Sequence, residues 1–309
     1  MSFYICSSKS KSHFGKEREG MTEDWGDQYD QTGREPFHWQ CSFAYKTADK
    51  IVLQGYDTTE LAEAGWSFAA VVFLLFQGRL PKINEEKMLN FFMVEFMEHA
   101  LSPSTLTARC CASGRPPLNA AIAAGIMTFG EAHGPGHLHG MMVHKYMKMA
   151  EEKGWTLAQT AEQLVRDHQG KMIMGLGQPQ HIHGDPRAIR IMKKARELGV
   201  AGKFHDLQIE IEKAFERING KKVWTNVIGG ANSVFMDLGF SPLAAWAIGV
   251  LCRGFSCAAH AMEEMTREKA WRASRTTKMI NLLDLSLQGP KYYDGPPLRP
   301  VPRPEDRKE

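Results

Sequence analysis

Apolar residues recur along most of the chain at the spacing of helices that bury one face, and strand-like patterns are confined to a short region near the N-terminus. Two short strands are predicted, over Phe37–Tyr45 and Lys50–Leu53, joined by a turn at residues 46–49. From about residue 59 onward the pattern predicts helices almost without a break. The predicted fold class is therefore all-α, with a minor β element near the N-terminus.

Capping residues and prolines indicate where these helices begin. Ser67 and Asn84 each precede an apolar segment, and Asp185 and Ser241 are each followed by proline, which favours the first helical position. A segment that is apolar all round, Asn119–Phe129, is predicted to be a central, fully buried helix. The other predicted helices cover Thr59–Gly65, Phe68–Gln77, Glu85–His99, a segment from Pro103, Met142–Glu152, Leu157–Asp167, Pro186–Leu198 and Leu243–Met265.

Composition excludes several classes of protein. The chain has 309 residues, of which 43% are hydrophobic and 24% charged, so it can bury a large core and is not wholly disordered. The net charge of +3 is too balanced for a nucleic-acid-binding surface. The longest uncharged apolar stretches, Pro116–Gly130 and Leu238–Cys252, are shorter than a membrane span, and residues 1–31 show no secretion signal. We therefore expect a cytoplasmic protein with neither nucleic-acid nor membrane partners, preceded by a flexible arm over residues 1–35.

Histidine is the residue type with an uneven distribution, because more than half of the 12 histidines lie between residues 133 and 183. They fall largely in two glycine-bearing segments, Gly130–Gly140 and Gly175–Arg187, which are predicted to be loops where backbone can approach a ligand closely. Arg187 is placed in the first turn of a predicted helix, where backbone N–H groups favour an anion. Arg253 lies in an otherwise apolar helix, so it either meets an internal acid or binds an anionic ligand.

The order and spacing of several short motifs resemble citrate synthase and citryl-CoA lyase chains, and the lyase branch is the more similar. The resemblance runs from about residue 37 to the end of the chain. It is carried by Gly55-Tyr56-Asp57, Trp66-Ser67-Phe68, Gly78-Arg79-Leu80-Pro81, Ser102-Pro103-Ser104, Gly130-Glu131-Ala132-His133-Gly134, Gly175-Leu176-Gly177, Asp185-Pro186-Arg187, Thr225-Asn226-Val227, Arg253, Ala259-His260 and the proline-rich tail from Tyr293.

The resemblance implies a homodimer, or a higher oligomer, of two-domain helical subunits. A large domain would comprise residues 36–138 and 229–309, and a small domain over residues 139–228 would close onto the substrate. The implied chemistry is an aldol- or Claisen-type formation or cleavage of a carbon–carbon bond. The partners would be an acyl-CoA and a small oxo-acid, hydroxy-acid or aldehyde. No bound cofactor is expected, because coenzyme A is part of the substrate or product.

The resemblance also assigns roles to individual residues. His133 takes the place of the histidine that holds the thioester carbonyl and stabilises the enol. Arg187 and Arg253 take the places of two arginines that bind substrate carboxylates. Asn226 and Ile228 occupy the segment that borders the substrate. We expect Arg187→Ala to weaken substrate binding far more than it lowers the melting temperature.

Two positions depart from the family's pattern. Gln178 stands where a second catalytic histidine is expected, and glutamine can donate a hydrogen bond but cannot supply a proton as a cation does. Ile228 stands where the family has the aspartate that removes the α-proton, and isoleucine cannot act as a base. An apolar Ile228 suits a bulkier or more apolar acyl group. The candidates for replacement acid/base groups are His181, His183, His137, His139 and Glu131.

Two alternatives remain open. One is a metal-dependent lyase in which His137 and His139 act with His133 or with the pair His181 and His183; catalytic zinc requires three protein ligands, but no H-E-x-x-H spacing is present and no metal ligands are assigned. The other is a non-catalytic homologue that binds an acyl-CoA or a partner, which the two replaced residues favour.

Overall fold

The computed structural model describes residues 41–178, 181, 184–270 and 293–304. The predicted arm over residues 1–35 and the first part of the predicted strand Phe37–Tyr45 lie outside the described residues. The chain separates into two units, residues 1–57 and 58–309, which are treated individually below. The division into a large and a small helical domain at residues 138 and 228 stays a prediction.

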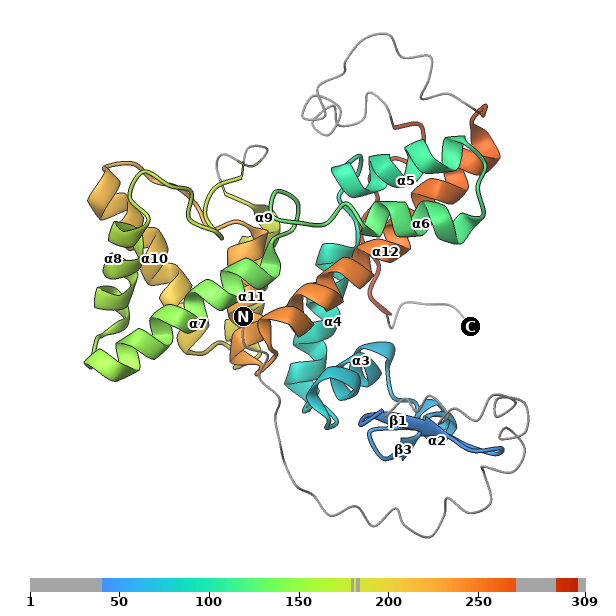
Figure 1. Cartoon of the computed structure of the whole chain (residues 1–309), viewed down its shortest axis with the longest axis horizontal. Helices are drawn as coiled ribbons and strands as arrows, with labels where there is room; N and C mark the ends of the chain where they lie inside the picture. The colour runs from blue at the N-terminus through green and yellow to red at the C-terminus, as the bar shows by residue number, and fades with distance from the viewer. Residues whose placement is uncertain (1–40, 179–180, 182–183, 271–292, 305–309) are drawn as a thin grey trace, which may run out of the picture. The chain divides into compact units, whose positions relative to one another are not determined.

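The described part of the first unit is a three-stranded antiparallel sheet of order β1-β2-β3 (Figure 1). It consists of β1 (Ala44–Lys46), β2 (Ile51–Leu53) and β3 (Tyr56–Asp57). β2 is paired on both sides, because Leu53 lies opposite both Ala44 and Tyr56. A tight turn at Gln54 and Gly55, with φ angles of 50° and 87°, links β2 to β3. The sequence pattern predicted the first two strands and missed the third, which is only two residues long.

The second unit is helical in its described residues, which confirms the predicted all-α class with a minor β element. Most of the predicted helices are present within a few residues of their expected ends. The helices are α2 (Thr58–Glu63), α3 (Phe68–Gln77), α4 (Ile83–Met97), α5 (Pro103–Ser113), α6 (Leu118–Ile126), α7 (Gly136–Lys153), α8 (Leu157–Asp167), α9 (Pro186–Glu197), α10 (Lys203–Asn219), α11 (Val227–Asp237) and α12 (Pro242–Arg267).

Helix starts follow the local capping chemistry. The side chains of Ser67, Asp185 and Ser241 each accept a hydrogen bond from a backbone N–H in the first turn of α3, α9 and α12. Asn84 does not cap α4 as predicted. The Glu85 carboxylate instead accepts from the backbone N–H of Lys82 at 2.7 Å, so the helix begins at Ile83. The Asn84 amide then donates to the Leu198 carbonyl at 2.9 Å and joins α4 to the end of α9.

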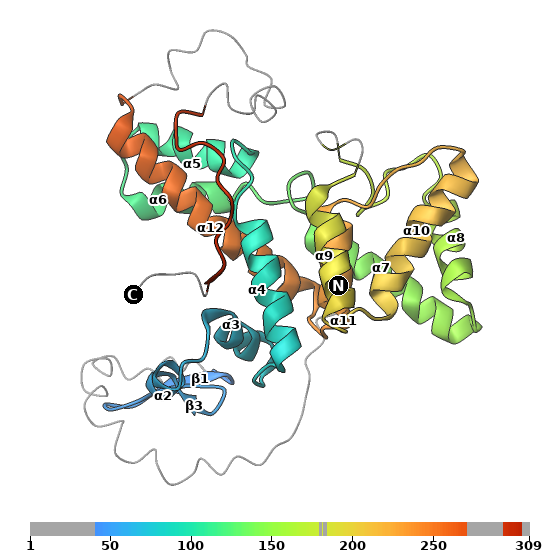
Figure 2. The ribbon, with the colours of Figure 1, turned by 180° about the vertical axis from the view of Figure 1, so that it is seen from behind.

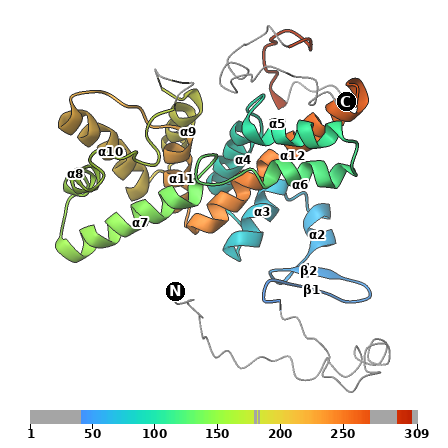
Figure 3. The same ribbon diagram turned by 45° about the horizontal axis from the view of Figure 1, so that its top comes forward.

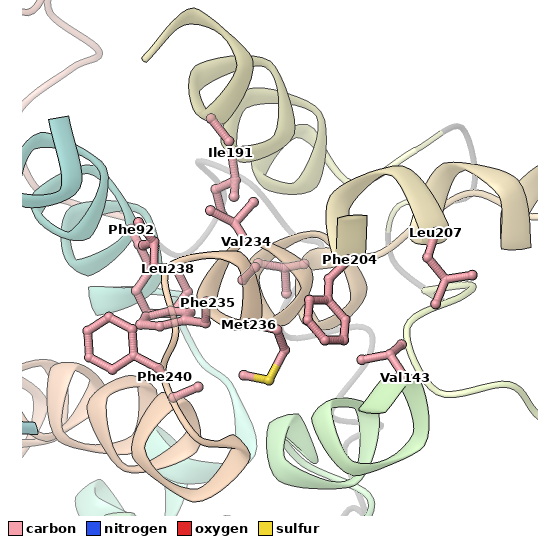
Figure 4. Packing of buried hydrophobic residues seen from close by; sticks show 14 of the residues in the cluster. Phe92, Val143, Ile191, Phe204, Leu207, Val234, Phe235, Met236, Leu238 and Phe240 are labelled. Atoms are coloured by element: carbon pink, nitrogen blue, oxygen red, sulfur yellow. The ribbon is translucent and has the colours of Figure 1, made fainter. Parts of the chain in front are cut away.

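The main hydrophobic core surrounds α11 (Figure 4). On one side of α11, Phe235 meets the ring of Phe92 edge-on, with ring centroids 4.4 Å apart, and the ring of Phe240 at 5.2 Å. On another side, Val234 approaches Ile191 of α9, and Figure 4 shows Met236 facing Phe204 of α10. Since α11 is buried along almost its whole length, the residues in its first turn are held rigidly in place.

The long helix α12 connects this core to a second, smaller cluster. α4 and α7 pack on α12, and α5 and α6 lie along its C-terminal half (Figures 1 and 2). By length and composition alone α12 could cross a membrane, so the expectation that no apolar stretch is long enough is wrong for this helix. Half of its most apolar stretch is buried against other helices, as in the core helix of a globular fold.

α6 is not the fully buried helix that its composition predicts. Only Ala121 and Gly125 are buried, where α6 packs against α5 and α12. A Cβ at Gly125 would lie 2.7 Å from Cys257 Sγ, so the glycine allows close contact with α12. On the other face Leu118 is exposed, and Met127 just beyond the helix is 82% exposed. One apolar face of α6 therefore packs against α5 and α12, and the other apolar face is exposed.

The segment Gly130–Gly140 is a loop only in its first half. α7 begins at Gly136, so His137 and His139 lie on a helix. Its glycines permit close helix packing: a Cβ at Gly136 would lie 3.0 Å from the Asn232 amide nitrogen, and one at Gly140 would lie 2.9 Å from Pro242 Cβ. The sequence pattern predicted a loop at these glycines because glycine occurs both in loops and where two helices pack closely. α7 then leads to the pair formed by α8 and α10 (Figure 3).

Candidate active site

His133 lies in the turn that precedes α7. Its backbone pairs with Gly130 through two hydrogen bonds of 3.0 and 3.2 Å, which fix the turn. The imidazole rests against Phe129 at a centroid distance of 4.6 Å, and its Nε2 shares a hydrogen bond of 3.1 Å with Ser104 Oγ. Burial, together with the nearby Arg253 cation, lowers the pKa of His133 to about 4. The ring is therefore neutral at pH 7 and can form one hydrogen bond with a ligand.

Arg253 is 3% exposed and carries its charge into the interior of the fold. Its guanidinium donates to three neutral oxygens: the carbonyls of Phe96 and Met97, and Ser102 Oγ, each at 3.1 Å. Both carbonyls belong to the last turn of α4, where the helix dipole favours a cation. This arrangement stabilises the guanidinium, and no carboxylate among the described residues is directly bonded to it.

A chain of hydrogen bonds joins His133 to Arg253. Ser104 Oγ, which contacts His133, lies 3.2 Å from Ser102 Oγ, and Ser102 accepts from Arg253. Both serines stand at the start of α5, where Ser102 precedes the first helical residue. Two residues that the resemblance assigns separately, to the thioester and to the carboxylate, thus belong to one connected unit.

His99 is a further member of this site that the sequence analysis missed. It lies two residues beyond the end of α4, next to the C-cap residue Glu98, and its ring centroid lies 6.1 Å from that of His181. Burial, the cations of Arg187 and Arg253 and the neighbouring His181 together lower the pKa of His99 to about 4. His99, His181, Arg187 and Arg253 therefore lie close enough together to interact electrostatically. In the sequence His99 is the last residue of the predicted helix Glu85–His99, and nothing in the local pattern marked it as a site residue.

Arg187 is bound to its neighbour Asp185. Its Nε and Nη2 donate to the two carboxylate oxygens of Asp185 at 3.1 and 2.9 Å, which is a bidentate pair. Asp185 also accepts from the backbone N–H of Val227 at 3.1 Å, so it ties the start of α9 to the start of α11. Despite burial, the hydrogen bonds and charge of Arg187 hold the pKa of Asp185 below its usual value.

A set of polar residues close to Arg253 was also missed by the sequence analysis. Glu98 accepts hydrogen bonds from Ser256 Oγ and from His260 Nε2. Arg109 Nη1 donates to His260 Nδ1 at 3.2 Å, and since arginine can only donate, the proton of His260 is assigned to Nε2. Although burial raises it, these hydrogen bonds and the charge of Arg253 bring the pKa of Glu98 to about 2. Glu98 is thus a fixed anion rather than a base at neutral pH.

Asn226 organises the two predicted site segments. Its side-chain oxygen accepts from the backbone N–H groups of Ile228 and Gly229 at 2.9 and 3.1 Å, and its amide donates to the Gly177 carbonyl at 2.7 Å. It therefore caps α11 and fixes the segment that leads into Gln178. The carbonyl of Gln178 accepts from the backbone N–H of His181 at 3.2 Å. His183 lies outside the described residues.

The remaining predicted acid/base residues lie apart from the His133–Arg253 chain. His139 is fully buried, and its Nε2 meets Gln208 Oε1 at 2.9 Å. His137 packs on Trp246 with a centroid distance of 4.9 Å, and Glu131 is exposed. Within the described residues, no group of three or more His, Cys, Asp or Glu side chains is placed to hold a metal ion. The described part of the chain therefore offers no support for the metal-dependent alternative.

Beside Ile228 lies a small apolar pocket, partly open to solvent, with room for about one water molecule. α4, the turn before α7, α11 and α12 all contribute to its walls. Its lining residues are Phe92, Phe96, Phe129, Gly134, Gly136, Ile228, Ala231, Asn232, Ala245, Trp246, Gly249 and Val250. Two of their polar groups are hydrogen-bonded within the fold: Trp246 Nε1 donates to the Gly134 carbonyl at 2.9 Å, and the Asn232 amide nitrogen donates to the Ile228 carbonyl at 2.9 Å.

The buried histidines predict a loss of stability in acid. Burial lowers the pKa of His139 to about 4, against 6.5 for the unperturbed group. The unfolded chain therefore binds more protons between these values, so stability is full above pH 6.5 and falls as the pH drops towards 4. His139 alone accounts for about 3 kcal/mol. Urea unfolding at pH 7.5 and 4.5 measures the difference. His139→Gln, which keeps a donor for Gln208, should show a smaller difference, and an equal one would contradict the assignment.

The pairing of Arg187 changes what its removal should do. Because Asp185 is 1% exposed, Arg187→Ala leaves a buried carboxylate without its cation, and we expect a loss of about 3 kcal/mol in unfolding free energy. The sequence alone led us to expect a small effect on stability. The double variant Arg187→Ala/Asp185→Asn should recover part of the loss, as measured by urea unfolding. Full stability in the single variant would show that the pair does not hold the two helix starts together.

With this geometry in place, similarity to known proteins assigns the chain to a family. Residues 82–274 match the family model described as citrate synthase, C-terminal domain. The protein belongs to the citrate synthase family, as the resemblance in the sequence implied. The citrate synthase of Heyndrickxia coagulans is 29% identical over 214 residues, or 67% of this chain and 54% of that protein. Citrate synthase 2 of Bacillus subtilis is 30% identical over 63% of this chain and 51% of that protein.

The chain thus spans about half the length of the curated relatives it matches. Among solved structures, the citryl-CoA lyase of Hydrogenobacter thermophilus superimposes with a TM-score of 0.68 and 27% identity, covering 85% of this chain and 97% of the lyase. An ATP citrate lyase from Methanosaeta concilii, in complex with (3S)-citryl-CoA, has a TM-score of 0.61 at 16% identity and shares the fold over 80% of this chain and 42% of that one.

Proposed function

We propose that the protein is a coenzyme A thioester-dependent lyase or synthase that breaks or forms a carbon–carbon bond by an aldol- or Claisen-type reaction. The observation that carries the proposal is the hydrogen-bonded chain from His133 through Ser104 and Ser102 to Arg253. It places a neutral imidazole and a buried cation in one rigid unit. The structural likeness to a citryl-CoA lyase supports the same chemistry.

In this proposal His133 binds the thioester oxygen. A neutral imidazole with a pKa of about 4 donates one N–H without losing its proton at pH 7, and such a donor stabilises the negative charge that develops on an enolate oxygen. The hydrogen bond with Ser104 sets the direction of the ring. No proton has to leave His133 for this role, so it is compatible with cleavage or formation.

The anionic partner is assigned to the other end of the chain. Arg253 offers a cation whose hydrogen bonds go to neutral oxygens, and Arg187 lies close enough to influence the same region, since both cations lower the pKa of His99. A small oxo-acid or hydroxy-acid carries the carboxylate that suits this environment. The acid formed or consumed would therefore lie between His99 and the two arginines.

The acid/base group differs from the family's pattern. Gln178 and Ile228 cannot transfer a proton, and the contacts of His137 and His139 are directed elsewhere. The ring centroid of His181 lies 6.1 Å from that of His99. We assign to His181 the transfer of the hydroxyl proton that a retro-aldol cleavage requires.

The direct test is an assay of the purified protein with CoA thioesters. Citryl-CoA and other 3-hydroxyacyl-CoAs are tested for release of an acyl-CoA and an oxo-acid or aldehyde, and the reverse mixtures for loss of free thiol or thioester. Turnover of at least one substrate is expected, and His181→Gln should reduce it while leaving CoA binding unchanged. A panel in which no thioester is cleaved or formed would contradict the enzymatic proposal.

A second candidate is a non-catalytic homologue that binds an acyl-CoA. The observation that favours it is the pair Gln178 and Ile228, which leaves both usual proton-transfer positions without a titratable group. The same panel separates the two candidates. Binding of thioesters without turnover, in either direction, would support the binding protein.

We also propose that the working unit is a homodimer. The exposed face of α6, which carries Leu118, Ala120 and Ala123, is an apolar surface of the kind that subunits bury. Light scattering at micromolar protein concentration should give twice the mass of the chain. A monomer at these concentrations would contradict the proposal.

A further inference from the structure

Glu98 places a negative charge near the buried cation of Arg253. It directly follows Met97, whose carbonyl accepts a hydrogen bond of 3.1 Å from the guanidinium. Its carboxylate accepts from Ser256 Oγ, and Ser256 lies three residues beyond Arg253 on α12, on the same face of that helix. Among the described residues, the hydrogen bonds of Arg253 go to neutral oxygens. The anion is therefore close to the cation without being hydrogen-bonded to it.

The two charges nevertheless interact. Burial lowers the pKa of Arg253, and the negative charge of Glu98 opposes that shift. Burial likewise raises the pKa of Glu98, and the charge of Arg253 is among the causes that lower it. An anionic ligand bound at Arg253 is therefore attracted by the guanidinium and repelled by Glu98.

A fixed imidazole holds Glu98 in this position. His260 Nε2 donates to Glu98 Oε1 at 3.4 Å, and Arg109 Nη1 donates to His260 Nδ1 at 3.2 Å, which sets the orientation of the ring. Arg109 is itself 8% exposed, and its Nε donates to Glu264 at 3.1 Å. The Glu98 side chain is 53% exposed, so water also reaches the carboxylate. This arrangement keeps the carboxylate charged and in one place.

We propose that Glu98 sets the charge selectivity of the acid site, because its fixed anion weakens the binding of acids in proportion to their negative charge. Glu98 acts by reducing the positive potential at Arg253 rather than by touching the ligand, so it is a positioning residue and not a catalytic one. The inference rests on the proposed function, since it takes the carboxylate of the acidic partner to lie at Arg253. Acids with one carboxylate are then favoured relative to acids with two.

The test titrates the protein with pyruvate, a monoanion, and with oxaloacetate, a dianion, by calorimetry at pH 7.5. Glu98→Gln removes the charge but keeps both hydrogen bonds, because the amide oxygen accepts from His260 and the amide nitrogen can donate to Ser256 Oγ. Since Coulomb energy is proportional to the charge of the ligand, we expect affinity to rise about threefold for pyruvate and about tenfold for oxaloacetate. Both gains should shrink in 0.5 M KCl, because salt screens a half-exposed charge.

Three further variants control the experiment. Glu86→Gln removes the same charge from the same helix α4, about three turns before Glu98, and Glu86 also accepts a hydrogen bond from a serine, Ser67. It should leave both affinities unchanged. Glu98→Asp keeps the charge and should restore the wild-type order of affinities. Glu98→Ser removes the charge and leaves room for water, so it gives the same reading if Glu98→Gln does not fold.

The outcomes separate this inference from the function on which it rests. If neither acid binds the wild-type protein, the assignment of the acid to Arg253 in the proposed function fails, and the inference fails with it. If the acids bind but Glu98→Gln leaves their affinities unchanged or weakens them, the inference is overturned while the function stands. An equal gain for both acids, or one that persists in 0.5 M KCl, would also overturn it. If only oxaloacetate binds measurably, its gain and the salt dependence decide the result.

Discussion

Replacing His133 by alanine is expected to lower the rate of carbon–carbon cleavage or formation by about 100- to 10,000-fold. In the proposed function the imidazole is the group of the hydrogen-bonded chain that contacts the thioester oxygen, and its removal leaves Ser104 Oγ without that partner. Folding should be little affected, because His133 lies in a turn held by backbone hydrogen bonds with Gly130. The comparison is made on whichever thioester the wild-type protein turns over.

His144→Ala provides the matched control. It is also a histidine, it lies on the exposed side of α7, and among the described residues its side chain hydrogen-bonds Met236 Sδ, outside the site. It should retain wild-type turnover. Comparable rates for His133→Ala and wild type, with melting temperatures unchanged, would remove His133 from the mechanism and with it the observation that supports the proposed function.

Replacing Arg253 by methionine is expected to lower the free energy of unfolding by about 3 kcal/mol and to abolish binding of the acidic partner. Methionine is close in length but leaves the carbonyls of Phe96 and Met97, together with Ser102, without their shared donor. Unpaired buried acceptors cost about 1–3 kcal/mol each, which the removal of a buried charge offsets only in part. Urea unfolding and calorimetric titration with oxaloacetate measure the two effects.

Arg267→Met on the same helix is the control. Its side chain is 46% exposed and its partners lie on the surface, so stability should change by less than about 0.5 kcal/mol. Arg253→Lys retains the charge but loses the planar fork, and we expect it to recover part of the stability but little of the binding. Full stability of Arg253→Met would show that the guanidinium does not secure the end of α4.

How far the sequence predicts this fold depends on the kind of signal. Capping residues such as Ser67, Asp185 and Ser241 act within one turn, and they located helix starts correctly. Glycine is ambiguous, since Gly136 and Gly140 permit close packing of α7 yet resemble loop residues. The exposure of α6 could not be predicted from composition, because an apolar face that stays exposed in the chain and one that the core buries have the same composition.

The candidate site, like the fold, could be predicted from the sequence only in part. Ordered motifs indicated His133, Arg187 and Arg253, because their spacing is a property of the family. Their surroundings depend on contacts between residues some 150 positions apart, such as Arg253 with Ser102, which no local pattern contains. His99 was missed for that reason: its position at the meeting of two arginines and His181 exists only after folding.

The hydrogen bonds of Arg253 have a consequence for the entropy of binding. An arginine has five N–H groups, and within the described part of the chain three hydrogen bonds hold the guanidinium against α4 and Ser102. The rotamer is thus fixed before any ligand arrives, and two N–H groups are left to meet it. An anion that binds there orders no side chain, so its affinity is not reduced by the loss of rotamer freedom that a flexible surface arginine would suffer.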